Sequence, residues 1–356
     1  MPSLLPKRNH YSFFTFPLIV GVFPLVYFVL THTRSTSQRE EGKLLVVATT
    51  GMIGDAVSRI AEDSVTLKTL MGPGVDPHSY ELSIQDGDLL MEADVVFYNG
   101  LHLEGAMHEP FEKMKSRADK EIYAAGDVLS DDNIIKDEGF DTGQDPHIFH
   151  SVRLWIRSVR YIGEKLILLD PKNAAFYRAN MEVYLAELKA LDKEIEEAIK
   201  KIPEAQRYLI TAHDAFGYYG QRYGLTVKSL QGISTATEPS LRNREDLKNF
   251  IIEHQIKMIF SEASVPQKGI QAVIESCEKE GYVVDASKQL YSDALGDRAG
   301  NAGTYVGMLR TNTQYIVAAY EDYTVKEKGK RKANSAPNTI KKVIRRKKKA
   351  KTISHA

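Results

Sequence analysis

Short apolar runs alternate with helix-length segments throughout residues 44–325, and this alternation restricts the possible fold more than any other feature. A short, continuous apolar run is typical of a strand that is buried on both faces. Strands separated by helix-length segments indicate βαβ units and a parallel sheet. The pattern therefore predicts an α/β protein of two lobes with parallel-sheet βαβ units. The expected strands are residues 44–50, 65–71 and 93–100 in the first lobe, and residues 208–213, 225–232, 257–262 and 282–286 in the second.

One long helix is predicted between the two lobes. Asp170 is a suitable N-cap, Pro171 is favoured at the first helical position, and Pro203 stops the helix. Apolar residues at helical spacing predict that one face packs against the lobes; they are Val183, Leu188, Leu191, Ile195, Ile199 and Ile202. The expected domains are an N-terminal lobe (44–169), the linking helix (170–203) and a C-terminal lobe (204–325).

The formal net charge of zero is the sum of three unlike segments. Residues 44–325 carry a net charge of −15, the first 43 residues carry +3, and residues 326–351 carry +12. A polar segment of one charge sign cannot bury a core, so residues 326–356 are predicted to form a basic disordered tail. Such a tail is either solvated or in contact with anionic lipid headgroups. It has no aromatic residue on which a base could stack, and we expect no nucleic-acid partner.

The uncharged segment from Phe13 to Leu30 follows two basic residues and precedes a polar stretch. This order is that of an export signal, and the length also reaches the lower limit for a spanning helix. Residues 1–43 are therefore interpreted as either a signal peptide or an uncleaved N-terminal anchor. Both interpretations place the rest of the chain in the periplasm or elsewhere outside the cytoplasm, held in the second case through residues 13–30. The single cysteine, Cys277, excludes an internal disulfide.

Three of the ten histidines stand close to the ends of expected strands or helices. His78 follows a strand, His213 ends a strand, and His147 lies just before a helix. Open α/β sheets bind ligands at the carboxyl ends of their strands. His78 and His147 also end the same tripeptide, Asp-Pro-His, in which the proline stiffens the loop. Any one such histidine can be a packed core or loop residue, but two Asp-Pro-His tripeptides and a third histidine at a strand end, distributed over both lobes, indicate a shared metal site.

Sequence motifs that would indicate catalysis or nucleotide binding do not occur. The chain has no His-Glu-x-x-His, no Gly-x-Gly-x-x-Gly, no P-loop and no Gly-x-Ser-x-Gly. We therefore expect that the protein is not an enzyme.

The sequence contains the stretches LMGPGVDPHSYE, ADVVFYNGLHLE, DPHIFHSVRLW, TAHDAFGYYGQRYGL and YSDALGDRAGNAGTYVGM. Together they resemble the metal-binding solute-binding proteins of ABC importers, the TroA-like family that handles zinc, manganese and iron. The resemblance extends from about residue 44 to about residue 320, so it leaves out the N-terminal segment and the basic tail. It implies two α/β lobes that flank a cleft and one long helix that links them, in agreement with the pattern of strands and helices.

The resemblance also implies four metal ligands. His78 and His147 match the histidines of the family's two Asp-Pro-His motifs, and His213 matches the third ligand position. The fourth implied ligand is Asp293 in the stretch SDALGD, whereas the second aspartate of that stretch does not match. Glu262, at the end of an expected strand, is interpreted as a supporting carboxylate near the site rather than as a ligand.

Three imidazoles and one carboxylate suit one divalent transition-metal ion, namely iron, manganese or zinc, as the transported ligand. Family members dedicated to zinc often insert a His-rich loop in the first lobe. Residues 130–145 here hold five aspartates, one glutamate and no histidine, which favours iron or manganese.

The resemblance implies a monomeric extracytoplasmic receptor that delivers the ion from the interlobe cleft to an ABC permease in the inner membrane. The alternative is an adhesin-like surface protein that retains the metal-binding fold.

Overall fold

The computed structural model describes residue 40 and residues 42–117, 120–136 and 143–335, with side chains described as far as residue 321. The predicted signal or anchor segment, including residues 13–30, lies outside the described residues apart from its last few positions. Within the described ranges, none of the helices combines the length and the apolar character that a membrane span requires.

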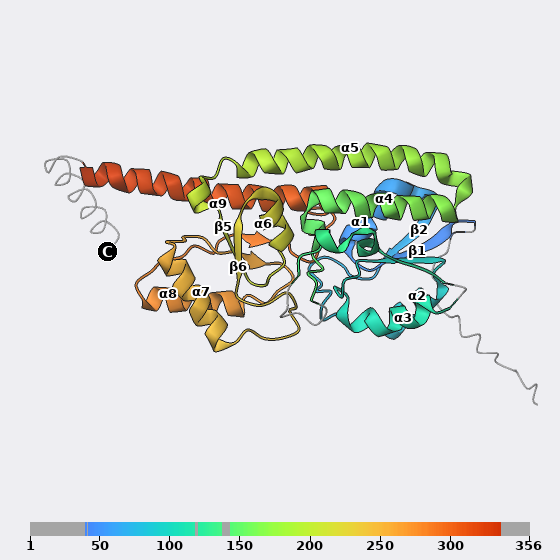
Figure 1. The fold of residues 1–356 in the computed structure, drawn as a ribbon, viewed down its shortest axis with the longest axis horizontal. Helices are drawn as coiled ribbons and strands as arrows, with labels where there is room; N and C mark the ends of the chain where they lie inside the picture. Colours follow the sequence, from blue (N-terminus) through green and yellow to red (C-terminus); the bar gives the residue numbers. More distant parts are fainter. Residues whose placement is uncertain (1–39, 41, 118–119, 137–142, 336–356) are drawn as a thin grey trace, which may run out of the picture. The chain divides into compact units, whose positions relative to one another are not determined.

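The N-terminal lobe is built on a four-stranded parallel sheet, as the apolar runs predict (Figure 1). Its strands follow the spatial order β2-β1-β3-β4. The strand β4 was not expected, because it is short and one of its side chains is exposed, so no apolar run marks it. The strands are β1 (Leu44–Ala48), β2 (Val65–Thr69), β3 (Val95–Tyr98) and β4 (Glu121–Ala124).

Helices cover both faces of this sheet, because successive strand residues point to opposite sides. Val46 and Phe97 belong to a core with α1, α4 and α5, whereas Val47 and Val96 belong to a core with α2 and α3. Burial on both faces explains why the strands are continuous apolar runs rather than alternating ones. The helices are α1 (Gly51–Ala61), α2 (Ile84–Glu92), α3 (His108–Lys115), α4 (Val152–Leu169) and α5 (Ala174–Ile199).

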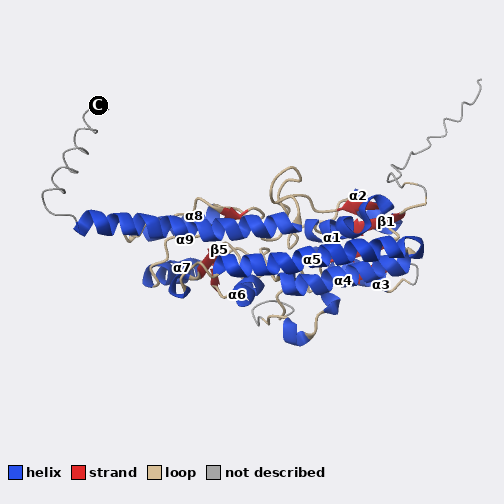
Figure 2. Cartoon of the chain, turned by 90° about the horizontal axis from the view of Figure 1, so that it is seen from above, coloured by secondary structure: helices blue, strands red, loops and turns tan. Residues whose placement is uncertain are grey.

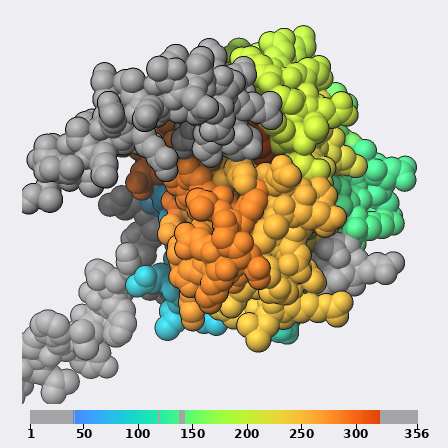
Figure 3. All heavy atoms as spheres, turned by 90° about the vertical axis from the view of Figure 1, so that its left-hand side faces the viewer, coloured from blue at the N-terminus to red at the C-terminus, as the bar shows by residue number. Residues whose placement is uncertain are grey.

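The C-terminal lobe contains two short parallel strand pairs, β5 with β6 and β7 with β8. The strand expected at residues 282–286 is wrong: only Asp285 pairs, with Met258, as an isolated bridge. Its side chain accepts a hydrogen bond from the Ser287 N–H, and this turn leads the chain away after one pair. Helices α7 and α8, yellow to orange in Figure 3, form much of one face of the lobe. The elements are β5 (Tyr208–Thr211), α6 (Gly217–Tyr223), β6 (Thr226–Ser229), α7 (Leu241–Glu253), β7 (Ser261–Glu262), α8 (Lys268–Lys279) and β8 (Gln289–Leu290).

The predicted linking helix is α5, which lies beside α4 in both views (Figures 1 and 2). It begins after a single 3₁₀ turn at Pro171–Asn173. Asp170 does not cap it through a backbone N–H; its carboxylate accepts hydrogen bonds from the Asn173 amide at 2.8 Å and the Tyr177 hydroxyl at 2.7 Å. The expected burial of Val183 is wrong, since its side chain is 68% exposed. It lies off the buried stripe, which consists of Tyr177, Met181, Tyr184, Leu185, Leu188, Leu191, Ile195 and Ile199.

Helix α9 (Tyr305–Ser335) corrects the predicted start of the disordered tail at residue 326. The helix continues ten residues beyond the expected boundary, through a stretch rich in lysine and arginine, which are good helix formers. No proline interrupts the helical sequence before Pro337. The rest of the predicted tail, residues 336–356, lies outside the described residues.

The largest apolar core of the described chain extends through both lobes. It joins strands and helices of the N-terminal lobe to Leu209 on β5, Tyr219 on α6 and several residues of α9, with the buried stripe of α5 between them. Trp155 on α4 stacks on Tyr305 of α9, with ring centroids 5.3 Å apart. The two lobes are therefore held together by shared packing along α5.

This shared core predicts how the stability of the protein changes when single side chains of α5 are shortened. Leu188→Ala removes a fully buried side chain and should lower the free energy of unfolding by about 2–5 kcal/mol. Val183→Ala, on the exposed side of the same helix, should change it by less than about 0.5 kcal/mol. Urea unfolding would measure both, and one cooperative transition is expected. Equal stability of the two variants, or separate transitions for the lobes, would contradict the shared core.

Candidate metal centre

The four residues implied as ligands lie together between the lobes, and we call His78, His147, His213 and Asp293 the His3Asp cluster. Each offers one potential ligand atom, and these four atoms lie within 4.8 Å of one another. All four side chains are buried. The N-terminal lobe supplies the first two, from the β2–α2 loop and the loop before α4. The C-terminal lobe supplies the others, from the segments that follow β5 and β8.

Asp293 connects the imidazoles of the two lobes. One carboxylate oxygen lies 3.2 Å from Nε2 of His147 and the other 3.1 Å from Nε2 of His213. Nε2 of His78 lies 3.2 Å from Nε2 of His147. Within the described residues, Oδ1 of Asp293 and Nε2 of His213 are nevertheless buried without a well-formed hydrogen bond. Such atoms are costly to bury unpaired, and a cation among the four groups would satisfy them.

The two Asp-Pro-His tripeptides form the same local turn. The carboxylate of Asp76 accepts the N–H of His78 at 2.9 Å, and that of Asp145 accepts the N–H of His147 at 2.9 Å. Asp145 also lies 2.8 Å from Nδ1 of His147. The loops were expected to be stiffened by proline, and the aspartate contacts were not predicted. The signal was an aspartate two residues before each histidine, the spacing at which a carboxylate accepts a backbone N–H.

Glu262 contacts His213 as the supporting carboxylate that was expected. Its Oε2 atom lies 2.5 Å from Nδ1 of His213, while Oε1 accepts the N–H groups of Ala212 at 2.7 Å and His213 at 2.9 Å. A carboxylate on Nδ1 fixes the proton there and leaves Nε2 free to bind a metal ion. Glu262 and Asp145 therefore orient two imidazoles of the cluster in the same way.

The charges around the cluster favour a positive charge at its centre. Burial lowers the pKa of His78 to about 3. Burial acts in the same direction on His147, but its contact with Asp145 and the negative charge of Asp293 beside it raise the pKa to about 9. Although burial opposes it, the charges of Asp293 and Glu262 raise the pKa of His213 well above its usual value. The carboxylates thus stabilise cationic partners, and a divalent ion is such a partner.

His150 and His254 are two of the four described histidines that lie outside the cluster. His150 is buried, with its ring 4.4 Å from that of Phe216, and burial lowers its pKa to about 3. The exposed His254 stacks on Phe250 at the end of α7, with ring centroids 4.1 Å apart. Both make packing contacts with aromatic rings, and neither belongs to the group of potential metal ligands.

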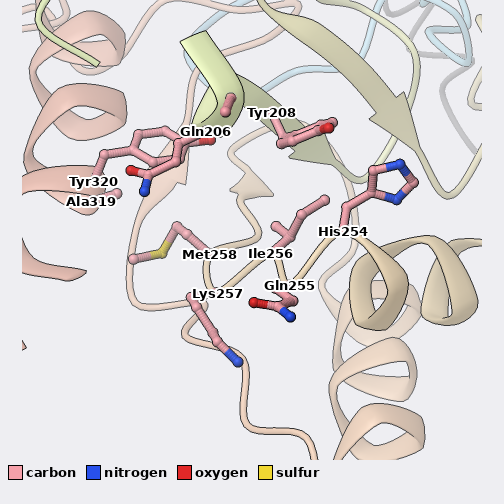
Figure 4. A pocket seen from close by; sticks show the side chains of 10 residues that line it. Gln206, Tyr208, His254, Gln255, Ile256, Lys257, Met258, Ala319 and Tyr320 are labelled. Carbon is pink, nitrogen blue, oxygen red and sulfur yellow. The ribbon is translucent and has the colours of Figure 1, made fainter. Parts of the chain in front are cut away.

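A separate surface pocket lies at the start of β5, away from the strand end that leads to His213. Its lining includes Tyr208, His254 and Lys257 from the C-terminal lobe and Tyr320 from α9 (Figure 4). This lining offers a single histidine and no carboxylate. The pocket therefore lacks the ligand set that the His3Asp cluster has.

Comparison with known proteins identifies the family. Residues 46–319 match the family model described as "Zinc-uptake complex component A periplasmic". The chain belongs to this family. The TroA-like resemblance of the sequence motifs is thereby confirmed, together with the two-lobed α/β fold.

Two curated relatives of the family are equally similar to this chain. The zinc-binding protein TroA of Treponema pallidum is 41% identical over 78% of this chain and 89% of its own length. The manganese-binding lipoprotein MntA of Bacillus subtilis is 41% identical over 81% of this chain and 93% of its own length. The solved structure of periplasmic zinc-binding TroA superposes with a TM-score of 0.76 over 78% of this chain and 99% of that one.

The contacts of Glu262 predict a role in metal affinity. Glu262→Gln keeps an oxygen for the two backbone N–H groups but removes the negative charge beside Nδ1 of His213. We expect metal affinity to fall about 10- to 100-fold, as for other carboxylates that support a ligating histidine. Competition titration against a chelator of known affinity would measure the loss. Glu253→Gln, on the exposed end of α7, is the matched control and should bind normally.

Proposed function

We propose that this protein is an extracytoplasmic substrate-binding protein of an ABC metal importer. The His3Asp cluster would capture one divalent transition-metal ion between the lobes and deliver it to a membrane permease. The observation that carries the proposal is the convergence of four buried ligand groups, drawn from both lobes, within 4.8 Å of one another. Two relatives support it: TroA is named a zinc-binding protein, and MntA is named a manganese-binding lipoprotein.

The composition of the cluster favours capture over catalysis. Nitrogen and oxygen donors of this kind suit zinc, iron(II) and manganese(II). Catalytic zinc sites usually have three protein ligands and keep a fourth position for water, whereas this cluster offers four buried protein groups. An ion held by ligands from both lobes would also fix the loops of one lobe against the other. The resulting surface is what a permease could distinguish from that of the empty protein.

The candidates for the physiological metal are iron, manganese and zinc. The acidic loop without histidine favours iron or manganese, while the zinc and manganese relatives are equally similar to this chain. Elemental analysis of protein isolated from metal-limited cells would decide among the three.

Binding stoichiometry tests whether the His3Asp cluster holds the ion. The purified chain should bind one equivalent of zinc or manganese, and His147→Ala combined with His213→Ala should abolish it, because one ligand is lost from each lobe. Titration with elemental analysis would measure this. The exposed histidine His254→Ala is the control and should leave one equivalent bound. Unchanged stoichiometry in the double variant would refute the proposed site.

Metal binding should also stabilise the folded protein. A ligand that binds only the folded state stabilises it by about 2.7 kcal/mol when its free concentration is 100 times Kd. Thermal unfolding should therefore occur at higher temperature with metal than after chelation. The double histidine variant should show no such difference.

Delivery to a permease is tested in cells. A strain that lacks the gene should accumulate less of the physiological metal under limitation, and the intact gene should restore uptake. Normal uptake in the deleted strain would favour the adhesin-like alternative.

A further inference from the structure

A second connection joins the lobes beside the His3Asp cluster. Asp76 uses one carboxylate oxygen to accept the N–H of His78 at 2.9 Å. Its other oxygen accepts the hydroxyl of Thr235 at 2.5 Å, and these two residues are 159 positions apart in the chain. One carboxylate therefore ties the turn that carries an N-terminal ligand to a loop of the C-terminal lobe.

The loop that carries Thr235 is itself fixed to the end of β5. The side-chain amide of Gln231 donates to the backbone carbonyls of Thr235 at 2.9 Å and Thr237 at 2.5 Å. The backbone N–H of Gln231 donates to the carbonyl of Ala212 at 2.9 Å. Ala212 is the residue before His213, so a continuous series of contacts leads from one ligand of the C-terminal lobe to one of the N-terminal lobe.

His78 depends on this connection more than the other imidazoles do. Nδ1 of His147 and of His213 each lies beside a carboxylate. For His78, no carboxylate contact to Nδ1 occurs within the described part of the chain, and Asp76 holds it through its backbone. Asp76 and Thr235 are also half-buried, at the edge of the buried cluster. The position of His78 therefore depends on the contact between the half-buried residues Asp76 and Thr235.

We propose that Thr235 is a positioning residue whose hydroxyl, through Asp76, holds the His78 turn against the C-terminal lobe and slows the release of the bound metal. The inference rests on the proposed metal-binding function. A hydrogen bond to a carboxylate is stronger than one between neutral groups, and its loss should affect the state in which His78 binds the ion. The expected effect is release about ten times faster.

The experiment uses the full chain loaded with zinc and mixed with an excess of a coloured zinc chelator. Thr235→Val removes the hydroxyl at nearly constant shape and should release zinc about ten times faster. Thr235→Ser keeps the hydroxyl and should stay within about twofold of the unchanged protein. Thr237→Val, the same substitution at an exposed position of the same loop, is the matched control. Release from Thr235→Val at the unchanged rate would overturn the proposal.

A second comparison separates positioning from general stability. In an Asp76→Ala background the hydroxyl has lost its partner, so Thr235→Val should no longer accelerate release. Equal acceleration in both backgrounds would overturn the proposal. If Thr235→Val folds poorly, Thr235→Ala takes its place in the same comparison. Binding of zinc that survives loss of both His147 and His213 would instead refute the proposed function, which keeps the two failures apart.

Discussion

The carboxylate of Asp293 is the constraint on which the arrangement of the His3Asp cluster between the lobes depends. It is buried, and an isolated charge in that position would be strongly unfavourable. Its two oxygens lie beside imidazoles of different lobes, and those imidazoles lower its pKa well below the usual value despite burial. Compensation of this charge therefore requires both lobes to be in place. The loops of the two lobes place His147 and His213 beside this carboxylate.

The packing along α5 limits how the lobes can respond to a metal ion. A single apolar core includes strands of both lobes and the buried stripe of α5. Large relative rotation of the lobes would expose this core and cost hydrophobic free energy. Changes on binding are therefore expected mainly in the loops around the cluster. The contact between Asp76 and Thr235 joins two of these loops.

Much of the fold could be predicted from sequence because its signals are local. Buried strands of the first lobe are continuous apolar runs, and the linking helix has a proline near each end. Predictions failed where a local pattern was incomplete: β4 is short and partly exposed, and Val183 is five residues from Leu188 rather than three or four. The tail was assigned from its polarity and single charge sign, although lysine and arginine also favour helix.

The candidate site was only partly accessible to the same reasoning. The repeated Asp-Pro-His tripeptides drew attention to His78 and His147, but a lone aspartate such as Asp293 has no local signature. It was implied only by the resemblance to a family. Contacts between distant side chains, such as that of Thr235 with Asp76, depend on how the lobes meet, and no pattern within one segment encodes them.

The burial of all four ligand groups has a consequence for the hydration of the ion. A cation that enters the cluster must exchange its water ligands for three imidazole nitrogens and one carboxylate. Mg²⁺ gives up water reluctantly and prefers octahedral oxygen coordination, so it gains little from this exchange. Transition-metal ions, which bind imidazole well, recover the cost of dehydration through the nitrogen donors. If the cluster binds an ion as proposed, its buried nitrogen donors therefore disfavour magnesium, whatever the size of the ion.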